Sequence, residues 1–398
     1  MKIAHVCSFY TPAICGVKQV VEELAKRQIA AGHEVHVYTS DWDKTKRIKT
    51  KEEAIEGVHI HRCKHIARVA NFGIIWPSVF FKILKEKFDI IHTHVFGHPH
   101  VVLAGLAAKI KKIPHIHTTH CPWSDAFRST VGRMGVFVSY NLFSRFSLRT
   151  ANKIIAITPW EVVFIKSYGG EESKIKVLPN GMAGIFSSRI ENNNFKKKYQ
   201  IKGNMVLFFG RLNVTKGPDK FIEIAKSILE ERNDLVFVLR GPDEGMREKV
   251  KAMIGNEKHI LLLEETRDRL EIAKMYQAAD VYVLPSYREG LPLTLFEAMA
   301  SGLPVVASPV NGIPYEMHEP ENGFLVSYGD IDGFKKRILE LIEDQKLREK
   351  ISKNNRKKAS RYNWEIIAQE TLKIYQEEID KYGKEGTQEN NLSSKRNQ

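Results

Sequence analysis

The sequence lacks the marks of secreted and membrane-spanning proteins. Its four cysteines are scattered and form no C-x-x-C pair, which is typical of a reduced cytosolic protein rather than of a disulfide scaffold. The longest apolar stretch, residues 69–84, is interrupted by Asn71 and Pro77 and falls short of the about 20 residues that a membrane-spanning helix needs. The first ten residues, MKIAHVCSFY, have too short an apolar run for a signal peptide and are expected to form a strand.

Acidic residues are scarce in the first half of the chain. Residues 1–178 carry 26 Lys and Arg against 14 Asp and Glu, which accounts for +12 of the net charge of +14. This imbalance favours an anionic partner for the first half, although solubility alone would also explain it. A nucleic-acid-binding protein would need a reading helix or an aromatic platform. The sequence has no such module, so no nucleic acid is expected as a partner.

What the sequence does contain is a regular alternation of strands and helices. Six short β-branched runs in each half alternate with amphipathic segments such as residues 16–32 and 219–233. This pattern predicts parallel sheets that are covered by helices on both faces. The expected fold class is therefore α/β, with two doubly wound Rossmann-like domains and an interdomain cleft. Ligands of such sheets bind beyond the carboxyl ends of the strands.

The domain boundary is expected where Pro179 and the Asn-Gly pair after it interrupt the pattern. The first domain would span residues 1–178 and the second residues 179–364. A long helix over residues 365–382 would return to the first domain. Residues 383–398 are polar, lack apolar anchors and are expected to be disordered.

Two strand-to-helix turns carry glycine or cations. Gly16 opens the first helix, where backbone amides can approach a ligand, although a simple turn glycine explains it equally well. The second turn, FFGRLNVTKGPDKF, is not a P-loop, because it lacks the pattern G-x-x-x-x-G-K-[ST]. It nevertheless brings Arg211 and Lys216 to the end of the strand that closes at Gly210. A guanidinium and an ammonium in one turn favour a phosphate ligand.

A third turn, SYREGLPLTLFEAMASG, holds two glutamates. Glu289 precedes a short helix whose first amides, around residues 290–293, suit a negatively charged group, and Glu297 lies about one turn inside that helix. Carboxylates beside a phosphate site make electrostatic sense if they bind sugar or ribose hydroxyls. A glycosidase acid/base pair would also use two carboxylates, but the neighbouring cations favour a diphosphate. An ordinary helix-start glutamate and a solvated glutamate remain the plain alternative.

Together these residues resemble the retaining GT-B-fold glycosyltransferases of family 4, over nearly the whole chain. GRLNVTKG looks like the family's G-R-L…K-G loop, and the two glutamates separated by seven residues match its hallmark pattern, P-S-x-x-E-G-x-P-L…E-A-M-A-x-G-x-P-V-V-A. The resemblance implies a nucleotide diphosphate sugar as co-substrate, no cofactor and no metal. It also implies a first domain that binds the acceptor.

The resemblance also implies roles for single residues. Arg211 and Lys216 would bind the donor diphosphate, Glu297 the ribose, and Glu289 the transferred sugar. His120 matches the family's histidine at the donor sugar and acceptor, so the implied catalytic residues are His120, Arg211, Lys216 and Glu289. The full donor site would consist of Gly16, Gly210, Arg211, Lys216, Gly241, Thr266, Glu289, Gly290, Leu291, Leu293 and Glu297.

Three departures from the family pattern affect these roles. Cys15 stands where the first loop usually has another glycine, so the amide geometry at Gly16 is open. Ala183 replaces an aspartate that often lies near the hinge. Gly241 lies between Arg240 and Pro242 instead of in a G-x-G pair, which blurs recognition of the nucleobase.

The predicted function is retaining transfer of a hexosyl group from GDP-mannose or a UDP-hexose to a lipid, lipid-linked or glycan acceptor. An epimerase or phosphorylase of the same fold is the alternative among enzymes, and a basic nucleic-acid- or membrane-binding protein is the alternative outside them. Residues 62–87 and 127–153 are basic and aromatic, which is typical of a surface that meets an anionic membrane, although core packing with solvated cations also explains it. The expected location is the cytoplasm, either free or at the inner face of the membrane.

Histidines gather in the first half, which holds 13 of the 15. Such clusters can bind zinc. We expect no metal site, because alternation within a strand separates side chains onto two faces and because HIHTTH (residues 115–120) lacks a second ligand set with clear spacing.

Overall fold

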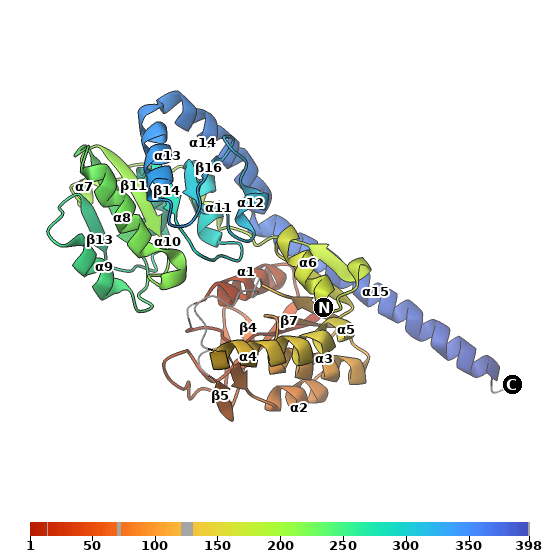
Figure 1. The fold of residues 1–398 in the computed structure, drawn as a ribbon. Helices are drawn as coiled ribbons and strands as arrows, with labels where there is room; N and C mark the ends of the chain where they lie inside the picture. Colours follow the sequence, from red (N-terminus) through yellow and green to blue (C-terminus); the bar gives the residue numbers. More distant parts are fainter. Residues whose placement is uncertain (14, 70–72, 121–129, 397–398) are drawn as a thin grey trace. The chain divides into compact units, whose positions relative to one another are not determined.

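The computed structural model describes residues 1–13, 15–69, 73–120 and 130–396, and it divides into two compact units (Figure 1). Unit 1 consists of residues 1–180 together with residues 364–398, and unit 2 is the continuous segment 181–363. The division after Asn180 lies two residues from the boundary expected from the sequence. Within the described chain, no helix combines the length and the apolar character that crossing a membrane requires.

Unit 1 is built on an eight-stranded sheet in the order β10-β9-β8-β7-β1-β2-β4-β3, in which only β3 is antiparallel to its neighbour. A separate antiparallel pair joins β5 and β6. The strands are β1 (Lys2–Val6), β2 (Glu34–Ser40), β3 (Glu52–Ile55), β4 (Val58–Cys63), β5 (Ala67–Val69), β6 (Gly73–Ile75), β7 (Ile90–His94), β8 (His115–Thr118), β9 (Lys153–Ala156) and β10 (Ile175–Val177).

Helices cover both faces of this sheet because successive strand residues point to opposite sides. Ile3 of β1 packs in the cluster that includes α1 and α15, whereas its neighbour Ala4 packs in the cluster that includes α2 and α3. The helices of unit 1 are α1 (Gly16–Ala30), α2 (Ser78–Lys85), α3 (Pro99–Lys111), α4 (Thr130–Ser139), α5 (Arg145–Thr150), α6 (Pro159–Ser167) and α15 (Trp364–Arg396), with a π-helical turn, η1 (Tyr140–Ser144), between α4 and α5.

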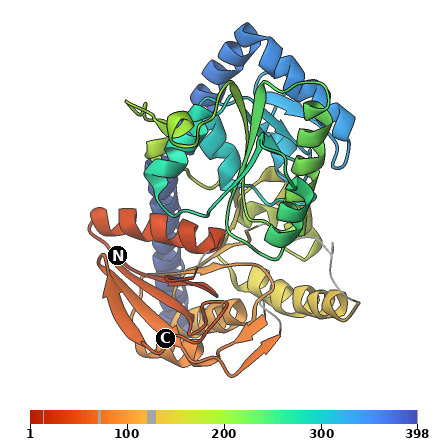
Figure 2. The same cartoon turned by 90° about the vertical axis from the view of Figure 1, so that its left-hand side faces the viewer.

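Unit 2 contains a fully parallel six-stranded sheet in the order β13-β12-β11-β14-β15-β16 (Figure 2). Its strands are β11 (Asn204–Phe209), β12 (Leu235–Arg240), β13 (Ile260–Leu263), β14 (Val281–Leu284), β15 (Val305–Ala307) and β16 (Gly323–Leu325). Its helices are α7 (Phe195–Lys198), α8 (Pro218–Leu229), α9 (Arg247–Ile254), α10 (Arg269–Ala278), α11 (Leu293–Ala300), α12 (Ile313–Glu316), α13 (Ile331–Glu343) and α14 (Gln345–Ala359).

The two faces of the second sheet are again divided by alternation. Phe208 of β11 packs in the core cluster that includes α8 and α13. On the other face, the ring of Tyr276 in α10 lies 5.6 Å from that of Phe209 and 5.7 Å from that of Tyr282. The sheet is therefore buried on both sides, which explains why its strands are continuously apolar.

All twelve strands expected from the sequence are present, and the sequence missed the short strands β3, β5, β6 and β10. The expected helix over residues 365–382 also exists, but α15 begins at Trp364 and continues to Arg396. The backbone is therefore helical over most of residues 383–398, where we expected disorder. Extending a helix that already exists costs much less than starting one, so a polar segment can follow the packed part of α15 in helical form.

Candidate active site

Two loops of unit 2 meet where the strand order reverses direction. β11 and β14 are neighbours, with Val206 opposite Val281. The loops that follow them are joined through the backbone: the amides of Tyr287 and Arg288 donate to the carbonyl oxygen of Thr215 at 2.9 and 3.2 Å. In doubly wound sheets this reversal point, at the carboxyl ends of the strands, is where ligands bind.

Glycine is required at two positions of this site. A Cβ on Gly217 would lie 2.1 Å from the carbonyl oxygen of Pro285, and Gly217 has a φ of +67°. A Cβ on Gly241 would lie 1.8 Å from the carbonyl oxygen of Gly210, the residue that ends the neighbouring strand. Both contacts allow backbones to approach closely, so the loops after β11, β12 and β14 are packed against each other.

Lys216 and Glu289 form an ion pair between the two loops. Their side chains are only 12% and 3% exposed, so the pair is largely removed from water. The other carboxylate oxygen of Glu289, Oε1, accepts a hydrogen bond of 2.7 Å from the hydroxyl of Ser286. Both oxygens of Glu289 are thus held in place, whereas Lys216 keeps further N–H donors, because an ammonium has three.

The helix α11 starts directly after this pair. Gly290, Leu291 and Pro292 lead into it, and Leu293 is its first residue. The carbonyl oxygen of Gly290 accepts from the amide of Gly312 at 3.3 Å, and Asn311 donates to the carbonyl oxygen of Glu289, which fixes this approach. The first amides of a helix have no partner within it and carry its positive dipole end. The site therefore offers amides, an ammonium and a carboxylate at one point.

Glu297 lies in the second turn of α11 and is buried. The hydroxyl of Tyr276 donates to its Oε2 at 3.1 Å. Burial raises the pKa of Glu297 to about 7, against the opposing effect of the Tyr276 hydrogen bond. This carboxyl group therefore changes its charge near neutral pH, and a ligand that donates hydrogen bonds to it would favour the ionised form.

Arg211 is on the same loop as Lys216 but pairs with a different partner. Its guanidinium contacts Glu244 at 2.8 Å, and Asn213 also donates to Glu244 at 2.8 Å. The side chain of Arg211 is 46% exposed. Asn213 also orders the loop around Lys216, because its Oδ1 accepts from the Lys216 amide at 3.1 Å.

Thr266 lies beyond β13 and before α10. Its hydroxyl contacts Glu271 at 3.4 Å and accepts from the amide of Asp268 at 3.2 Å. Arg240, the residue before Gly241, donates to the carbonyl oxygen of Glu264 at 2.7 Å and contacts Glu271 at 3.2 Å. The loop after β13 is thereby tied to the end of β12, beside the Gly210–Gly241 contact.

The other two predicted site residues belong to unit 1. Gly16 is the first residue of α1, whose N-cap Cys15 accepts from the amide of Lys18 at 3.4 Å, and a Cβ on Gly16 would meet nothing within 4 Å. His120 follows β8 with a positive φ of 57°, and its Nε2 lies 3.0 Å from Nδ1 of His94. Burial lowers the pKa of His120 to about 3, so its ring is neutral at pH 7.

The structure corrects the geometric reason for expecting no metal. His92 and His94 are two residues apart in β7, so they point to the same face, and His5 lies opposite His92 on the neighbouring strand β1. These three side chains come within 4.8 Å of each other through possible ligand atoms, as do those of Glu34, His36 and His59. The H-x-H spacing of His92 and His94 was the sequence signal for the first of these groups.

Several site residues were missed by sequence reasoning. They are Asn213, Ser286, Tyr276, Glu244, Glu271 and Asn311. All of them touch a predicted residue across a loop or from another helix, as Ser286 touches Glu289. Only Asn213 and Ser286 lie inside quoted motifs, so only they carried a signal.

Two family profiles cover most of the chain. The profile described as Glycosyltransferase Family 4 matches residues 14–183, and the one described as Glycosyl transferases group 1 matches residues 190–358.

Relatives of known name agree with both profiles. The chain is 32% identical to an Escherichia coli UDP-Gal:alpha-D-GlcNAc-diphosphoundecaprenol alpha-1,3-galactosyltransferase over 74% of its own length and 76% of the relative's. It is 26% identical to a phosphatidyl-myo-inositol mannosyltransferase of Mycolicibacterium smegmatis over 94% of both chains. Among solved structures, the Anabaena HepE protein in complex with UDP and glucose superimposes with a TM-score of 0.76 at 19% identity, over 95% of this chain and all of that one.

Proposed function

Because the chain belongs to the family 4, group 1 glycosyltransferases, with the GT-B fold and a nucleotide sugar as substrate, we propose that it transfers a hexosyl group with retention at the anomeric carbon. The acceptor we propose is a lipid, a lipid-linked sugar or a glycan. No cofactor or metal takes part in this proposal. The observation that carries it is the buried pair Lys216–Glu289 at the start of α11.

The unequal roles of the two charges support a sugar diphosphate as the donor. Lys216 gives one of its N–H donors to Glu289 and keeps others for the oxygens of the β-phosphate. The amides at the start of α11 add donors on the same side. Glu289 is held by Lys216 and Ser286 and accepts hydrogen bonds from the hydroxyl groups of the transferred hexose. Arg211 turns from the exposed Glu244 to the diphosphate when the donor binds.

In the proposed reaction, the bond between the anomeric carbon and the diphosphate oxygen breaks, and charge separates across it. Negative charge then grows on the β-phosphate, where Lys216, Arg211 and the α11 amides stabilise it, an effect worth several kcal/mol in enzymes of this kind. The acceptor hydroxyl attacks from the face that the diphosphate leaves, and a phosphate oxygen takes its proton. Glu289 is a poor candidate for a nucleophile, because both of its oxygens are occupied by donors.

Glu297 and the loops at Gly241 and Thr266 would hold the nucleoside part of the donor. Glu297 accepts the ribose hydroxyls, and backbone at Gly241 and the loop after β13 meets the base. UDP-hexoses are the first donors to test, since the 32% identical relative is named for UDP-Gal. GDP-mannose is second, since relatives at about a quarter identity are named mannosyltransferases.

A lipid or lipid-linked acceptor is supported by an exposed surface of unit 1. The segment α4–η1–α5 presents apolar side chains to solvent, with Phe137 68%, Met134 64% and Leu142 61% exposed. Arg145 and Arg149 are exposed beside them, and residues 127–153 include no Asp or Glu. Residues 70–72 and 127–129, which belong to the two predicted basic stretches, lie outside the described residues. Exposed apolar groups with cations favour an anionic membrane surface, which would place the enzyme at the inner face of the membrane.

The membrane part of the proposal is tested with vesicles. Co-sedimentation with vesicles containing anionic lipid should fall strongly in Phe137→Ser/Leu142→Ser and stay unchanged in Val163→Ser, whose side chain is 70% exposed on α6. Equal binding by all three proteins would remove the lipid surface from the proposal and leave the donor site untouched.

The donor part is tested by thermal stabilisation with UDP, GDP, ADP and their sugar conjugates, followed by product analysis. A ligand at a hundred times its Kd adds about 2.7 kcal/mol. We expect one nucleotide to raise Tm and to lose that effect in Glu297→Ala and Lys216→Ala. Donor converted without acceptor would indicate an epimerase, and phosphate-dependent cleavage a phosphorylase. Either product would overturn the proposed transfer.

A further inference from the structure

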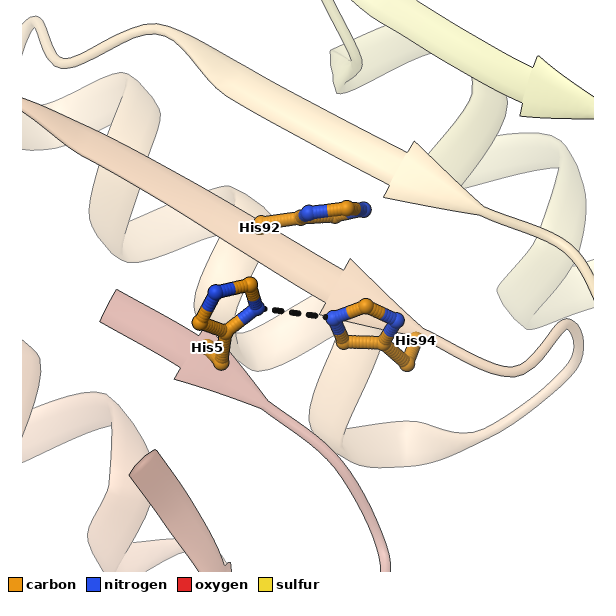
Figure 3. A group of neighbouring side chains, drawn as sticks. All are labelled: His5, His92 and His94. Atoms are coloured by element: carbon orange, nitrogen blue, oxygen red, sulfur yellow. Dashed lines mark hydrogen bonds between the residues drawn. The ribbon is translucent and has the colours of Figure 1, made fainter. Parts of the chain in front are cut away.

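Four side chains of unit 1 form an unbranched hydrogen-bonded chain that ends at His120. Oε1 of Gln28 in α1 lies 2.9 Å from Nε2 of His5, and Nδ1 of His5 lies 3.0 Å from Nε2 of His94. Nδ1 of His94 then lies 3.0 Å from Nε2 of His120. Figure 3 shows the central link between His5 and His94, with His92 beside it.

The hydrogen-bonded row of Gln28, His5, His94 and His120 is electrically neutral at physiological pH. Burial lowers the pKa of His5 to about 4 and that of His120 to about 3, and it holds the pKa of His94 well below its usual value. A neutral imidazole has one N–H donor and one acceptor nitrogen. Each ring that bonds on both sides must therefore donate on one side and accept on the other, so all three links share one direction.

The carboxamide of Gln28 decides that direction. Its oxygen faces His5 and can only accept, so His5 must carry its proton on Nε2. Nε2 of Gln28 has no hydrogen-bond partner among the described residues.

We propose that Gln28, His5 and His94 are positioning residues that hold His120 in the tautomer with its proton on Nε2 and its lone pair on Nδ1. The proton of each ring then points along the chain toward Gln28. Nδ1 of His120 has no hydrogen-bond partner within the described residues, and it is the ring atom left to accept a bond from a substrate hydroxyl. This inference rests on the proposed function and on the role at the donor sugar and acceptor that the family resemblance implies for His120.

Metal binding by His5, His92 and His94 would have to replace hydrogen bonds that are already formed. Each ring nitrogen of His5, His92 and His94 already has a hydrogen-bond partner, which for His92 are Tyr375 and Thr118. No carboxylate takes part in these contacts, and an unbalanced divalent charge in a fully buried site is costly. The observed hydrogen bonds use all six nitrogens without any such cost, those of His5 and His94 within the relay and those of His92 outside it.

The first test measures the tautomers directly in the full-length protein. Two-bond ¹H–¹⁵N correlation spectra with ¹⁵N-labelled histidine distinguish a proton on Nε2 from one on Nδ1, and loss of signals in His120→Ala assigns that ring. We expect His5, His94 and His120 all to carry the proton on Nε2. A proton on Nδ1 of His120, a mixture of tautomers, or stoichiometric zinc in the purified protein would overturn the proposal.

The second test breaks the hydrogen-bonded relay at Gln28, the end opposite His120. Gln28→Met keeps the length of the side chain but removes the acceptor, so His120 should show both tautomers. The kcat of transfer should then fall by about tenfold, a part of what a positioned imidazole contributes, while the Kd of the donor nucleotide stays unchanged. The matched control is Thr371→Val, which removes a buried hydroxyl of α15 whose partner among the described residues is the carbonyl oxygen of Ile367 at 2.7 Å. A single tautomer in Gln28→Met, or an equal loss of kcat in both variants, would contradict the relay.

Failure of the proposed function gives a different result. If the spectra show the expected tautomers but no nucleotide sugar is turned over by the wild-type protein, the relay stands as structure and the transferase assignment falls. If transfer is normal and His120 has its proton on Nδ1, the reverse holds.

Discussion

The two units of the chain use the same strand order but place opposite chemistry where that order reverses. In unit 1, β1 lies between β2 and β7, and in unit 2, β11 lies between β12 and β14. The reversal in unit 1 holds buried neutral imidazoles in line, from His5 to His94. The reversal in unit 2 holds a buried ion pair, Lys216 with Glu289.

This difference indicates which kind of ligand group each unit can bind. Removing a charge from water is expensive, and a buried ion pair recovers that cost only with good geometry and further hydrogen bonds. Keeping Lys216 and Glu289 at such a place makes sense if a charged ligand completes the pair. A neutral imidazole chain has no charge to offer, but it has a direction, which suits a hydroxyl group. One fold thus supports an anion site and an oriented acceptor atom.

The largest expected effect comes from breaking the ion pair at the reversal point of unit 2. Lys216→Met should reduce transfer by about a hundredfold or more, because it removes a donor to the leaving phosphate. It should also lower the free energy of unfolding by about 3 kcal/mol, because Glu289 is left buried without its partner. The measurements are steady-state kinetics and chemical denaturation.

Two variants serve as controls for that prediction. Lys220→Met removes a more exposed ion pair with Glu223 and should change stability by less than about 1 kcal/mol, with normal turnover. Lys216→Met/Glu289→Gln should recover most of the lost stability without recovering activity. Near-normal turnover in Lys216→Met would remove it from the phosphate site.

The next effect compares the glycines at the starts of α1 and α8, Gly16 and Gly217. Gly217→Ala would force a Cβ against the carbonyl oxygen of Pro285 at a positive φ and should cost more than about 1 kcal/mol of stability, together with most of the activity. Gly16→Ala should leave stability within about 0.5 kcal/mol, because its Cβ meets nothing within 4 Å. Denaturation curves of both variants provide the test. A large loss of stability in Gly16→Ala would show that its surroundings are tighter than described.

A moderate effect should come from pH and should be confined to unit 2. The pKa of Glu297 is raised to about 7, whereas those of His5 and His120 lie at about 4 and 3. If ribose hydroxyls bind the ionised carboxylate, donor nucleotide should bind about tenfold more tightly at pH 8 than at pH 6. Titration calorimetry should show this change in the wild type and not in Glu297→Gln. A parallel slope in both proteins would assign the pH effect to another group.

The sign for stability without ligand is the opposite. A carboxyl group with a raised pKa in the folded state holds its proton longer than in the unfolded chain. Its contribution is therefore fully present below the ordinary value of 4.5 and is lost as the pH rises through about 7. Glu297→Gln should flatten this part of the unfolding profile.

The smallest effect concerns the exposed pair in unit 2. Glu244→Gln releases Arg211 from an ion pair whose members are 46% and 34% exposed, a contact worth about 0.2–1 kcal/mol. Donor affinity should therefore rise by a few-fold at most, and the gain should shrink in high salt. Weaker binding in Glu244→Gln would mean that Glu244 itself contacts the donor.

The sequence allowed the fold and the charged site to be predicted for different physical reasons. Strand positions follow from local patterns, and all twelve expected strands are present, whereas β3 and β10 are short and largely exposed and give little pattern. Lys216 and Glu289 could be related because each follows a buried strand, and parallel strands end at one edge. Ser286, between strand and glutamate, could not be singled out because serine is common in turns.

The imidazole relay was harder to anticipate. Its members come from β1, α1, β7 and the end of β8, and no periodicity in sequence connects them. The two-residue spacing of His92 and His94 places them on one face of β7, contrary to the separation we expected, and nothing local indicated that Gln28 would contact His5. The pairing of Arg211 with Glu244 is missing from sequence reasoning for the same reason: 33 positions separate the two residues, and their contact depends on how the loops after β11 and β12 close.

The course of the chain also determines when each unit can be completed during synthesis. Unit 2 is continuous and has all of its strands once residue 363 has emerged, but unit 1 lacks α15 until the residues after 363 have also been made. Until then, apolar side chains of β1, β7 and β8 lack their contacts with Trp364 and Tyr375, which are fully buried in the complete unit. Unit 1 is therefore begun before unit 2 and completed after it, so a nascent chain that ends just after unit 2 has one complete unit and one unit with an exposed apolar face. Such exposed surface is what chaperones recognise in growing chains.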